Sequence, residues 1–89
     1  SGSIDCAIDG FPRVQSCEFG VRRAGFGRAT VEVTLPDGDS RVFAFNDGTV
    51  RAISGASSFR YGQQGDDWFL TVNGGQERYT IPDAVVNGG

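Results

Sequence analysis

The segment 29–53, ATVEVTLPDGDSRVFAFNDGTVRAI, carries the strongest structural signal of the chain. Apolar and polar residues alternate from Thr30 to Leu35, a period of two that is typical of a β-strand with one buried face. Two turn signals follow, Pro36-Asp37-Gly38 and Asp47-Gly48, and each suits a tight β-hairpin. The segment is therefore predicted to form three consecutive antiparallel strands.

The two turns also predict which residues face one another across the strands. From the loops outward, the predicted pairs are Leu35–Asp39, Val33–Arg41, Val31–Phe43 and Ala29–Phe45 in the first hairpin, and Phe45–Val50 and Phe43–Ala52 in the second. A slip of one residue would turn every side chain to the opposite face. Both registers place Phe43 and Phe45 on the valine face, so the two hairpins are predicted to share one core.

The rest of the chain shows the same pattern in shorter pieces. Strands are predicted at Cys17–Val21 and Phe59–Tyr61, with a turn over Gly62–Asp67. A turn at Gly74-Gly75 joins two further strands and predicts the pairs Val72–Glu77, Leu70–Tyr79 and Trp68–Ile81. Pro82 ends the last strand because proline cannot donate a ladder hydrogen bond, and residues 83–89 are predicted to be a tail.

About seven short strands without helical periodicity predict an all-β fold, a small antiparallel β-barrel or sandwich. A chain of 89 residues is the size of one small domain. Ser1-Gly2-Ser3 is interpreted as the remnant of a tag, which leaves residues 4–89 as the domain. A domain of this size buries a limited core, so an additional stabilising link is expected.

Cys6 and Cys17 are the two cysteines, and their number and spacing predict a disulfide. The alternatives are a redox pair, which more often has CxxC spacing, and half of a metal site, which would need two further Cys or His ligands. A disulfide implies an oxidising compartment. We therefore expect a periplasmic or secreted protein, with any signal peptide or lipid anchor lying outside this sequence.

Composition argues against several classes of function. The net charge is −3, with eight arginines and no lysine, whereas a nucleic-acid-binding domain is usually basic. The absence of histidine removes the commonest general base and zinc ligand, so an enzyme is not expected. No apolar run approaches the ~20 residues of a membrane-spanning helix.

The C-terminal segment GGQERYTIPDAVVNGG, residues 74–89, resembles a group of small uncharacterised periplasmic proteins of Gram-negative bacteria that share a G-x-ERYxIPDAVxxGG-like tail. The likeness covers most of the chain from Cys17 onward. It implies export and carries no known chemistry.

Residues 54–72, SGASSFRYGQQGDDWFLTV, are more distantly similar to the periplasmic and membrane-bound inhibitors of C-type lysozyme, which are small eight-stranded barrels. In that family a serine of the SGA motif and a lysine of a second motif enter the lysozyme active site. The resemblance therefore implies a binding role for Ser54 and Tyr61. Gln64 stands where the lysine should be, and the family's disulfide lies elsewhere in the chain.

Two groups of charged residues are candidates for ligand binding. Arg22, Arg23 and Arg28 flank a Gly-x-Gly segment that could hold a phosphate or carboxylate, and the alternative is a solvated loop. Carboxylates at predicted turns could bind calcium or a lanthanide ion, with Asp66 and Asp67 preferred and Asp37 and Asp39 next. Aspartate is also an ordinary turn residue.

The function predicted from these observations is a non-catalytic binding module. A protein partner is expected first, such as a cell-wall hydrolase that the module inhibits. The alternatives are a hard-cation protein, in which a second copy completes the ion's ligands, and a structural accessory domain. The chain is accordingly expected to be a monomer or an ion-linked dimer that binds no nucleic acid.

Overall fold

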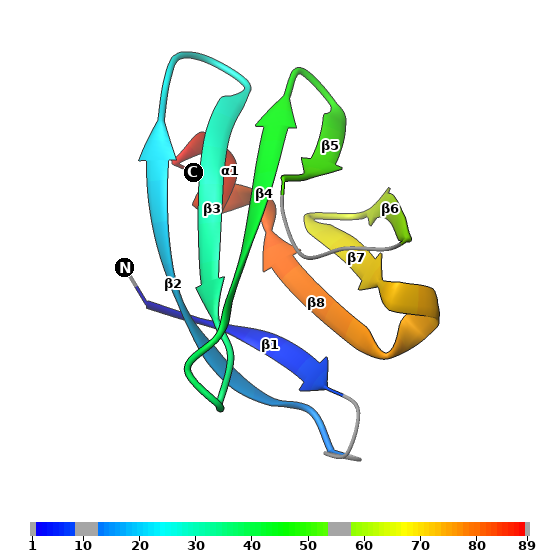
Figure 1. Ribbon diagram of the computed structural model, residues 1–89. Helices are drawn as coiled ribbons and strands as arrows, with labels where there is room; N and C mark the ends of the chain where they lie inside the picture. The colour runs from blue at the N-terminus through cyan, green and yellow to red at the C-terminus, as the bar shows by residue number, and fades with distance from the viewer. Residues whose placement is uncertain (1, 9–12, 54–57, 89) are drawn as a thin grey trace.

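A computed structural model describes residues 2–8, 13–53 and 58–88 of the chain (Figure 1). Within these ranges it contains eight strands, one 3-10 turn and one short helix. The strands are β1 (Gly2–Ile8), β2 (Gln15–Arg23), β3 (Arg28–Thr34), β4 (Ser40–Asn46), β5 (Thr49–Ala52), β6 (Phe59–Gln64), β7 (Asp67–Val72) and β8 (Glu77–Pro82); the 3-10 turn η1 is Asn73–Gly75 and the helix α1 is Asp83–Asn87.

All eight strands belong to one antiparallel sheet in the order β5-β4-β3-β2-β1-β8-β7-β6. The sheet curls into a nearly closed barrel, so β5 and β6, the two ends of this order, come round to the same side of the molecule (Figure 1). Strand β1 joins the two halves of the sheet because it pairs with β2 on one edge and with β8 on the other.

The predicted registers of all three hairpins are confirmed. Val31 faces Phe43 and Phe45 faces Val50 in the central hairpins, and Leu70 faces Tyr79 in the C-terminal one. Asp47 and Gly48 both adopt positive φ, 53° and 91°, which the type I′ turn requires. Turn chemistry and apolar alternation agree here, and for that reason the register follows from local sequence.

Three parts of the secondary structure differ from the sequence-based expectation. Residues 2–8 form the additional strand β1, which includes Gly2 and Ser3 of the segment interpreted as a tag remnant. The turn expected over Gly62–Asp67 is confined to Gly65-Asp66, because Gln64 pairs with Asp67. The expected tail forms helix α1, whose Val86 is buried as it packs on the barrel.

The inward-facing residues form one hydrophobic core that runs through the barrel. Its largest fully buried side chains are Tyr79, Phe43, Leu70 and Ile81. Phe43 lies at the centre, with ring centroids 5.3 Å from Tyr79 and 5.9 Å from Phe59. Because Phe43 belongs to β4 and Phe59 to β6, these rings connect the two halves of the sheet through the interior.

Cys6 and Cys17 form the predicted disulfide, which links β1 to β2. Both cysteines are about 2% exposed and belong to the core. They lie two positions out of register, since Ile4 pairs with Cys17 and Cys6 pairs with Gln15. The bond therefore reinforces the β1–β2 pairing diagonally.

We expect the double substitution Cys6→Ala/Cys17→Ala to lower the free energy of unfolding by about 3 kcal/mol. Without the covalent link between two residues 11 positions apart, the unfolded chain gains conformational entropy. Urea unfolding at neutral pH would measure the change. Ser16→Ala, an exposed substitution on the same strand, is the control and should change stability by less than about 0.5 kcal/mol. A loss below about 1 kcal/mol in the double variant would show that the disulfide is not a major stabilising link.

Candidate functional site

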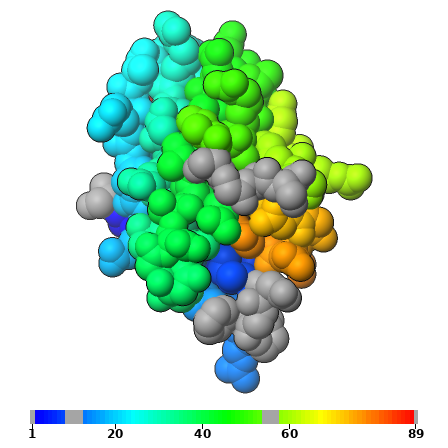
Figure 2. Space-filling view, in the orientation of Figure 1, coloured from blue at the N-terminus to red at the C-terminus, as the bar shows by residue number. Residues whose placement is uncertain are grey.

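The candidate site is the seam, which we define as the line along which β5 and β6 adjoin without backbone pairing. In the described part of the chain, β5 pairs with β4 alone and β6 pairs with β7 alone. Each strand therefore has one edge that is not hydrogen-bonded to another described strand. Figure 2 shows the yellow-green β6 segment projecting from the surface on the right of the molecule.

The β6–β7 register determines which backbone groups of β6 point toward the seam. In an antiparallel pair, residues that bond to the neighbouring strand alternate with residues whose N–H and C=O groups point away from it. The Asn73 N–H donates to the Ser58 carbonyl, 2.9 Å away, and Ser58 therefore belongs to the bonded set. The N–H and C=O groups of Phe59, Tyr61 and Gln63 consequently point into the seam.

Aromatic side chains line the inner side of the seam. Phe59 and Tyr61 stack with centroids 6.0 Å apart, and Tyr61 lies 6.5 Å from Trp68. Tyr61 remains 42% exposed, although its neighbour Trp68 is buried. The predicted placement of Phe59 and Tyr61 on one face is confirmed, and Tyr61 offers apolar surface at the edge of the core.

One end of the seam opens into a hollow of about 240 Å³, which we call the end hollow. It is lined by residues of the β2–β3, β4–β5 and β6–β7 ends and of helix α1: Phe26, Gly27, Phe45, Asp47, Gly48, Gln63, Trp68, Asp83, Val86 and Asn87. Phe45 and Trp68 form its apolar wall, with ring centroids 5.5 Å apart. The Trp68 indole N–H donates to Asp83 Oδ1 at 3.0 Å. The hollow thus has an aromatic wall and polar groups around it.

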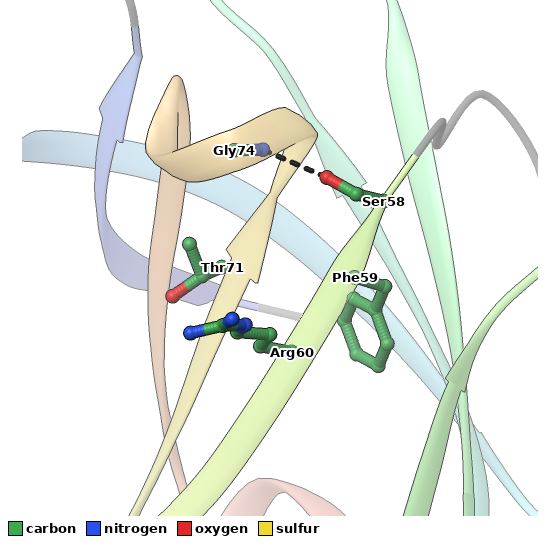
Figure 3. A pocket seen from close by; sticks show the side chains of 5 residues that line it. All are labelled: Ser58, Phe59, Arg60, Thr71 and Gly74. Carbon is green, nitrogen blue, oxygen red and sulfur yellow. Dashed lines mark hydrogen bonds between the residues drawn. The ribbon is translucent and has the colours of Figure 1, made fainter.

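A second hollow, the side hollow, has a volume of about 420 Å³ and lies on the outer face of β6 and β7. Its lining residues are Ser58, Phe59, Arg60, Thr71 and Gly74. Figure 3 shows Arg60 reaching across toward Thr71 of β7, while Phe59 points to the opposite side of β6. Ser58 Oγ accepts a 2.8 Å hydrogen bond from the Gly74 N–H and ties η1 to the start of β6.

A charged network lies inside the barrel near the starts of β4 and β8. Arg41 donates through Nε and Nη2 to the two carboxylate oxygens of Glu77, both at 2.9 Å. The Tyr79 hydroxyl donates to Glu77 Oε1 at 2.7 Å, and the Asn73 amide donates to Oε2 at 3.5 Å. The Glu77 carboxylate, 7% exposed as a residue, is therefore satisfied by three neighbours.

The network shifts the pKa values of its members. Burial alone would raise the pKa of Glu77, but the hydrogen bonds from Arg41 and Tyr79 outweigh it and hold that pKa below its usual value. The hydrogen bond to Glu77 raises the pKa of Arg41. Burial, and next the Glu77 carboxylate, raise the pKa of Tyr79. All three groups consequently keep their ordinary charge at neutral pH, and the network stabilises the fold.

Of the three arginines predicted to bind an anion, Arg23 is hydrogen-bonded to helix α1. Arg22 and Arg23 lie in β2 and Arg28 begins β3. The Arg23 guanidinium donates to the carbonyls of Ala84 and Val85, at 3.5 and 3.1 Å, in helix α1. Arg23 thus stabilises the helix, and Arg22 is exposed on the outer face of the sheet.

The acidic residues predicted to bind an ion are not brought together. Asp37 and Asp39 lie at the β3–β4 turn, where Asp37 Oδ1 accepts the Asp39 N–H at 2.9 Å. Asp66 and Asp67 lie at the β6–β7 turn, beside the end hollow and away from the β3–β4 turn. Within residues 2–8, 13–53 and 58–88, no three Asp, Glu, Cys or His side chains are grouped as metal ligands. Ion binding stays a prediction.

Ser54, the other residue that the inhibitor resemblance implies, lies outside the described residues, as do Gly55 and Ala56. Tyr61, the second residue that the resemblance implies, lies in the described part of the chain, at the seam. Gln64 closes the β6–β7 turn opposite Asp67.

Sequence reasoning did not single out the Arg41–Glu77 pair. A signal for the pair was present, since the predicted registers place Arg41 beside Val33 and Glu77 beside Val72 on the inward face. Two inward charges of opposite sign in one small barrel indicate an ion pair.

No protein-family model matches the chain, and no curated protein or solved structure matches it either. No helix among the described residues has the length and apolar character needed to cross a membrane.

Proposed function

We propose that this protein is a non-catalytic binding module of the periplasm or the extracellular space, and that it binds an extended segment of a partner protein along the seam. The observation that carries the proposal is the free edge of β6. Phe59, Tyr61 and Gln63 direct backbone N–H and C=O groups to this edge, and an added strand can pair with them.

The surroundings of the edge favour a peptide over a small molecule. Backbone pairing supplies affinity, and pockets beside the strand select alternate side chains. An added segment would cover the exposed ring of Tyr61 and place one inward side chain at the end hollow, against Trp68 and Phe45. A long aromatic edge without a partner is also an aggregation hazard, and a bound segment removes it.

Two further observations support the non-catalytic, exported character of the module. The chain has no histidine, and the half-buried Arg41 and the buried Tyr79 both donate hydrogen bonds to the buried Glu77 carboxylate. The disulfide Cys6–Cys17 is typical of proteins in oxidising compartments. Inhibition of a cell-wall hydrolase is a narrower form of the same proposal, in which the hydrolase supplies the bound segment.

The proposal is tested by selecting displayed random decapeptides against the wild-type protein, with counter-selection against Gln63→Pro. Proline at position 63 removes an N–H that points into the seam, whereas the bonds to β7 come from Gly62 and Gln64. We expect peptides that bind wild type with micromolar affinity and bind Gln63→Pro at least about tenfold more weakly, since one bond and the register are lost.

Gln63→Ala is the matched control, because it keeps the backbone N–H and should bind as wild type does. Circular dichroism and thermal melting establish that both variants are folded. Selected peptides that bind Gln63→Pro and wild type equally would overturn the proposal, as would a selection that yields no binder at all.

A further inference from the structure

The end hollow combines an aromatic wall with two carboxylates. Phe45 and Trp68 form the wall, and Asp47 and Asp83 are acidic residues of the lining. No arginine is among the described residues that line it. Aromatic rings attract cations through the negative face of the ring, and carboxylates attract them through their charge. The hollow therefore favours a cationic group over a neutral or anionic one.

Asp47 is held beside the hollow by the β4–β5 turn. Its backbone N–H donates to the Gly27 carbonyl at 2.8 Å, which fixes this turn to the β2–β3 loop. A Cβ atom at Gly27 would lie 3.6 Å from Asp47 Oδ1, so the carboxylate lies over the Gly27 backbone. The Asp47 carboxylate is exposed and forms no ion pair with another described residue. Its charge is therefore available to a ligand.

Asp83 is half-buried at the start of helix α1, and its carboxylate accepts hydrogen bonds from neutral groups. Oδ1 accepts the Trp68 indole N–H and the Asn87 amide, both at 3.0 Å, and Oδ2 accepts the same amide at 3.1 Å. Arg23 reaches helix α1 but donates to backbone carbonyls there, and it forms no ion pair with Asp83. A carboxylate can accept about four hydrogen bonds, so Asp83 keeps capacity for a cationic donor.

Phe26 gives the hollow an exposed apolar rim. Its side chain is 96% exposed although it belongs to the lining. The aliphatic stem of a lysine or arginine can cover such a ring while the charged head stays among polar groups. A long basic side chain therefore matches both the apolar rim and the carboxylates. A metal ion matches the carboxylates alone, and the described residues do not group three ligands for one.

The register of β6 places one position of a bound segment beside the end hollow. Gln63 pairs with Trp68, and both residues line the hollow. The Gln63 N–H and C=O point into the seam, so a residue of the added segment lies opposite Gln63. Opposed residues on neighbouring strands share one face of the sheet, with Cβ atoms about 5 Å apart. The side chain at this position therefore extends toward the end hollow.

We infer that the partner segment bound along the seam places a lysine or arginine opposite Gln63, and that Asp47 and Asp83 bind its charged head in the end hollow. The inference rests on the function proposed above and specifies the partner's chemistry. Two positions away, the next inward side chain of the segment meets the ring of Tyr61 and is apolar. The net charge of −3 also favours a basic partner.

The inference is tested with the decapeptides selected on wild type, in which we expect Lys or Arg to be enriched at one position. Replacing this residue by norleucine or citrulline, which removes its charge, should weaken binding about fivefold or more. The variant Asp47→Asn/Asp83→Asn should weaken the basic peptides to a similar extent. Asp47→Asn alone gives a second variant that keeps the turn, because Asn-Gly also suits a type I′ hairpin.

Glu32→Gln is the matched control, because it removes one negative charge from an exposed position on the outer face of β3. Affinities are measured at about 0.15 M salt, where exposed charges more than about 8 Å apart are largely screened. Glu32→Gln should then bind the basic peptides as wild type does. Circular dichroism and thermal melting establish that each variant is folded.

The outcomes separate the two proposals. Peptides that require the Gln63 N–H but carry no basic residue, or basic peptides that bind Asp47→Asn/Asp83→Asn as tightly as wild type, would overturn the inference and leave the seam proposal standing. Failure of the seam proposal is detected separately by Gln63→Pro, which leaves both carboxylates in place.

Calcium chloride, titrated by NMR without peptide, tests a metal ion as the occupant of the end hollow. Saturable calcium binding at Asp47 and Asp83 that leaves the peptide affinity unchanged would assign the two carboxylates to an ion and overturn the inference.

Discussion

Replacing Phe43 by glutamate is expected to unfold the domain. Phe43 is 0% exposed and lies between the rings of Phe59 and Tyr79. Loss of a buried phenylalanine costs about 3–5 kcal/mol, and an unpaired buried carboxylate adds several more. The sum is comparable to the whole stability of a small domain, about 5–15 kcal/mol. Far-ultraviolet circular dichroism and the loss of a cooperative urea transition would detect the unfolded chain.

Thr30→Glu is the matched control for this substitution. Thr30 lies on the outer face of β3 between Arg22 and Ala44, so a glutamate there stays in water. Its effect should remain within about 0.5 kcal/mol. Comparable destabilisation by both variants would contradict the assignment of inner and outer faces.

Arg41→Ala is expected to lower the free energy of unfolding at pH 7 by about 3–4 kcal/mol, because it leaves the buried Glu77 carboxylate without its bidentate partner. Tyr79 and Asn73 would still donate to Glu77, which places the estimate toward the lower end of the range for a broken buried pair. Urea unfolding measures the loss. Arg51→Ala, an exposed position on β5, should change stability by less than about 0.5 kcal/mol.

The effect of Arg41→Ala is also expected to depend on pH. The pKa of Glu77 is lower in the folded protein than its usual value of 4.5, so its contribution to stability is present above pH 4.5 and is lost as the pH falls through the folded pKa. Without Arg41 the folded pKa rises and this contribution disappears. The difference between wild type and Arg41→Ala should therefore shrink as the pH falls below 4.5, and a constant difference would show that the ion pair is not its cause.

The central strands could be predicted because their signals are local. Alternation from Thr30 to Leu35 and the turn at Asp47-Gly48 act over a few residues and agree with one another, so the register follows without knowledge of the whole fold. The disulfide was predictable for a similar reason, since the chain offers one pairing of its two cysteines.

The parts that could not be predicted depend on contacts between distant segments. Ile4 and Cys6 alternate inward in β1, but the short segment lies beside Ser1-Gly2-Ser3 and is stabilised by β2 and β8 rather than by a hairpin of its own. Helix α1 has five residues, too few for a periodic pattern, and depends on Val86 and Arg23 for its position.

The candidate site belongs to the same category. Consecutive strands usually pair, and β5 and β6 are an exception to that rule. Their unpaired edges depend on how the whole sheet curls and are not encoded in a local pattern. The lining of the side hollow, which combines Arg60 of β6 with Thr71 of β7, is likewise visible only when the register of these two strands is known.

The place of β1 between β2 and β8 has a consequence for the order of folding. Asp5 pairs with Thr80, so one of the pairings that hold the barrel together joins residues near opposite ends of the described chain, whereas β5 and β6 are adjacent in sequence and remain unpaired. Pairing of distant segments is slow because the entropy of a long loop must be lost first. The meander from β2 to β5 and the β7–β8 hairpin can form early from local contacts, and docking of β8 onto β1 is then the late event that completes the native sheet.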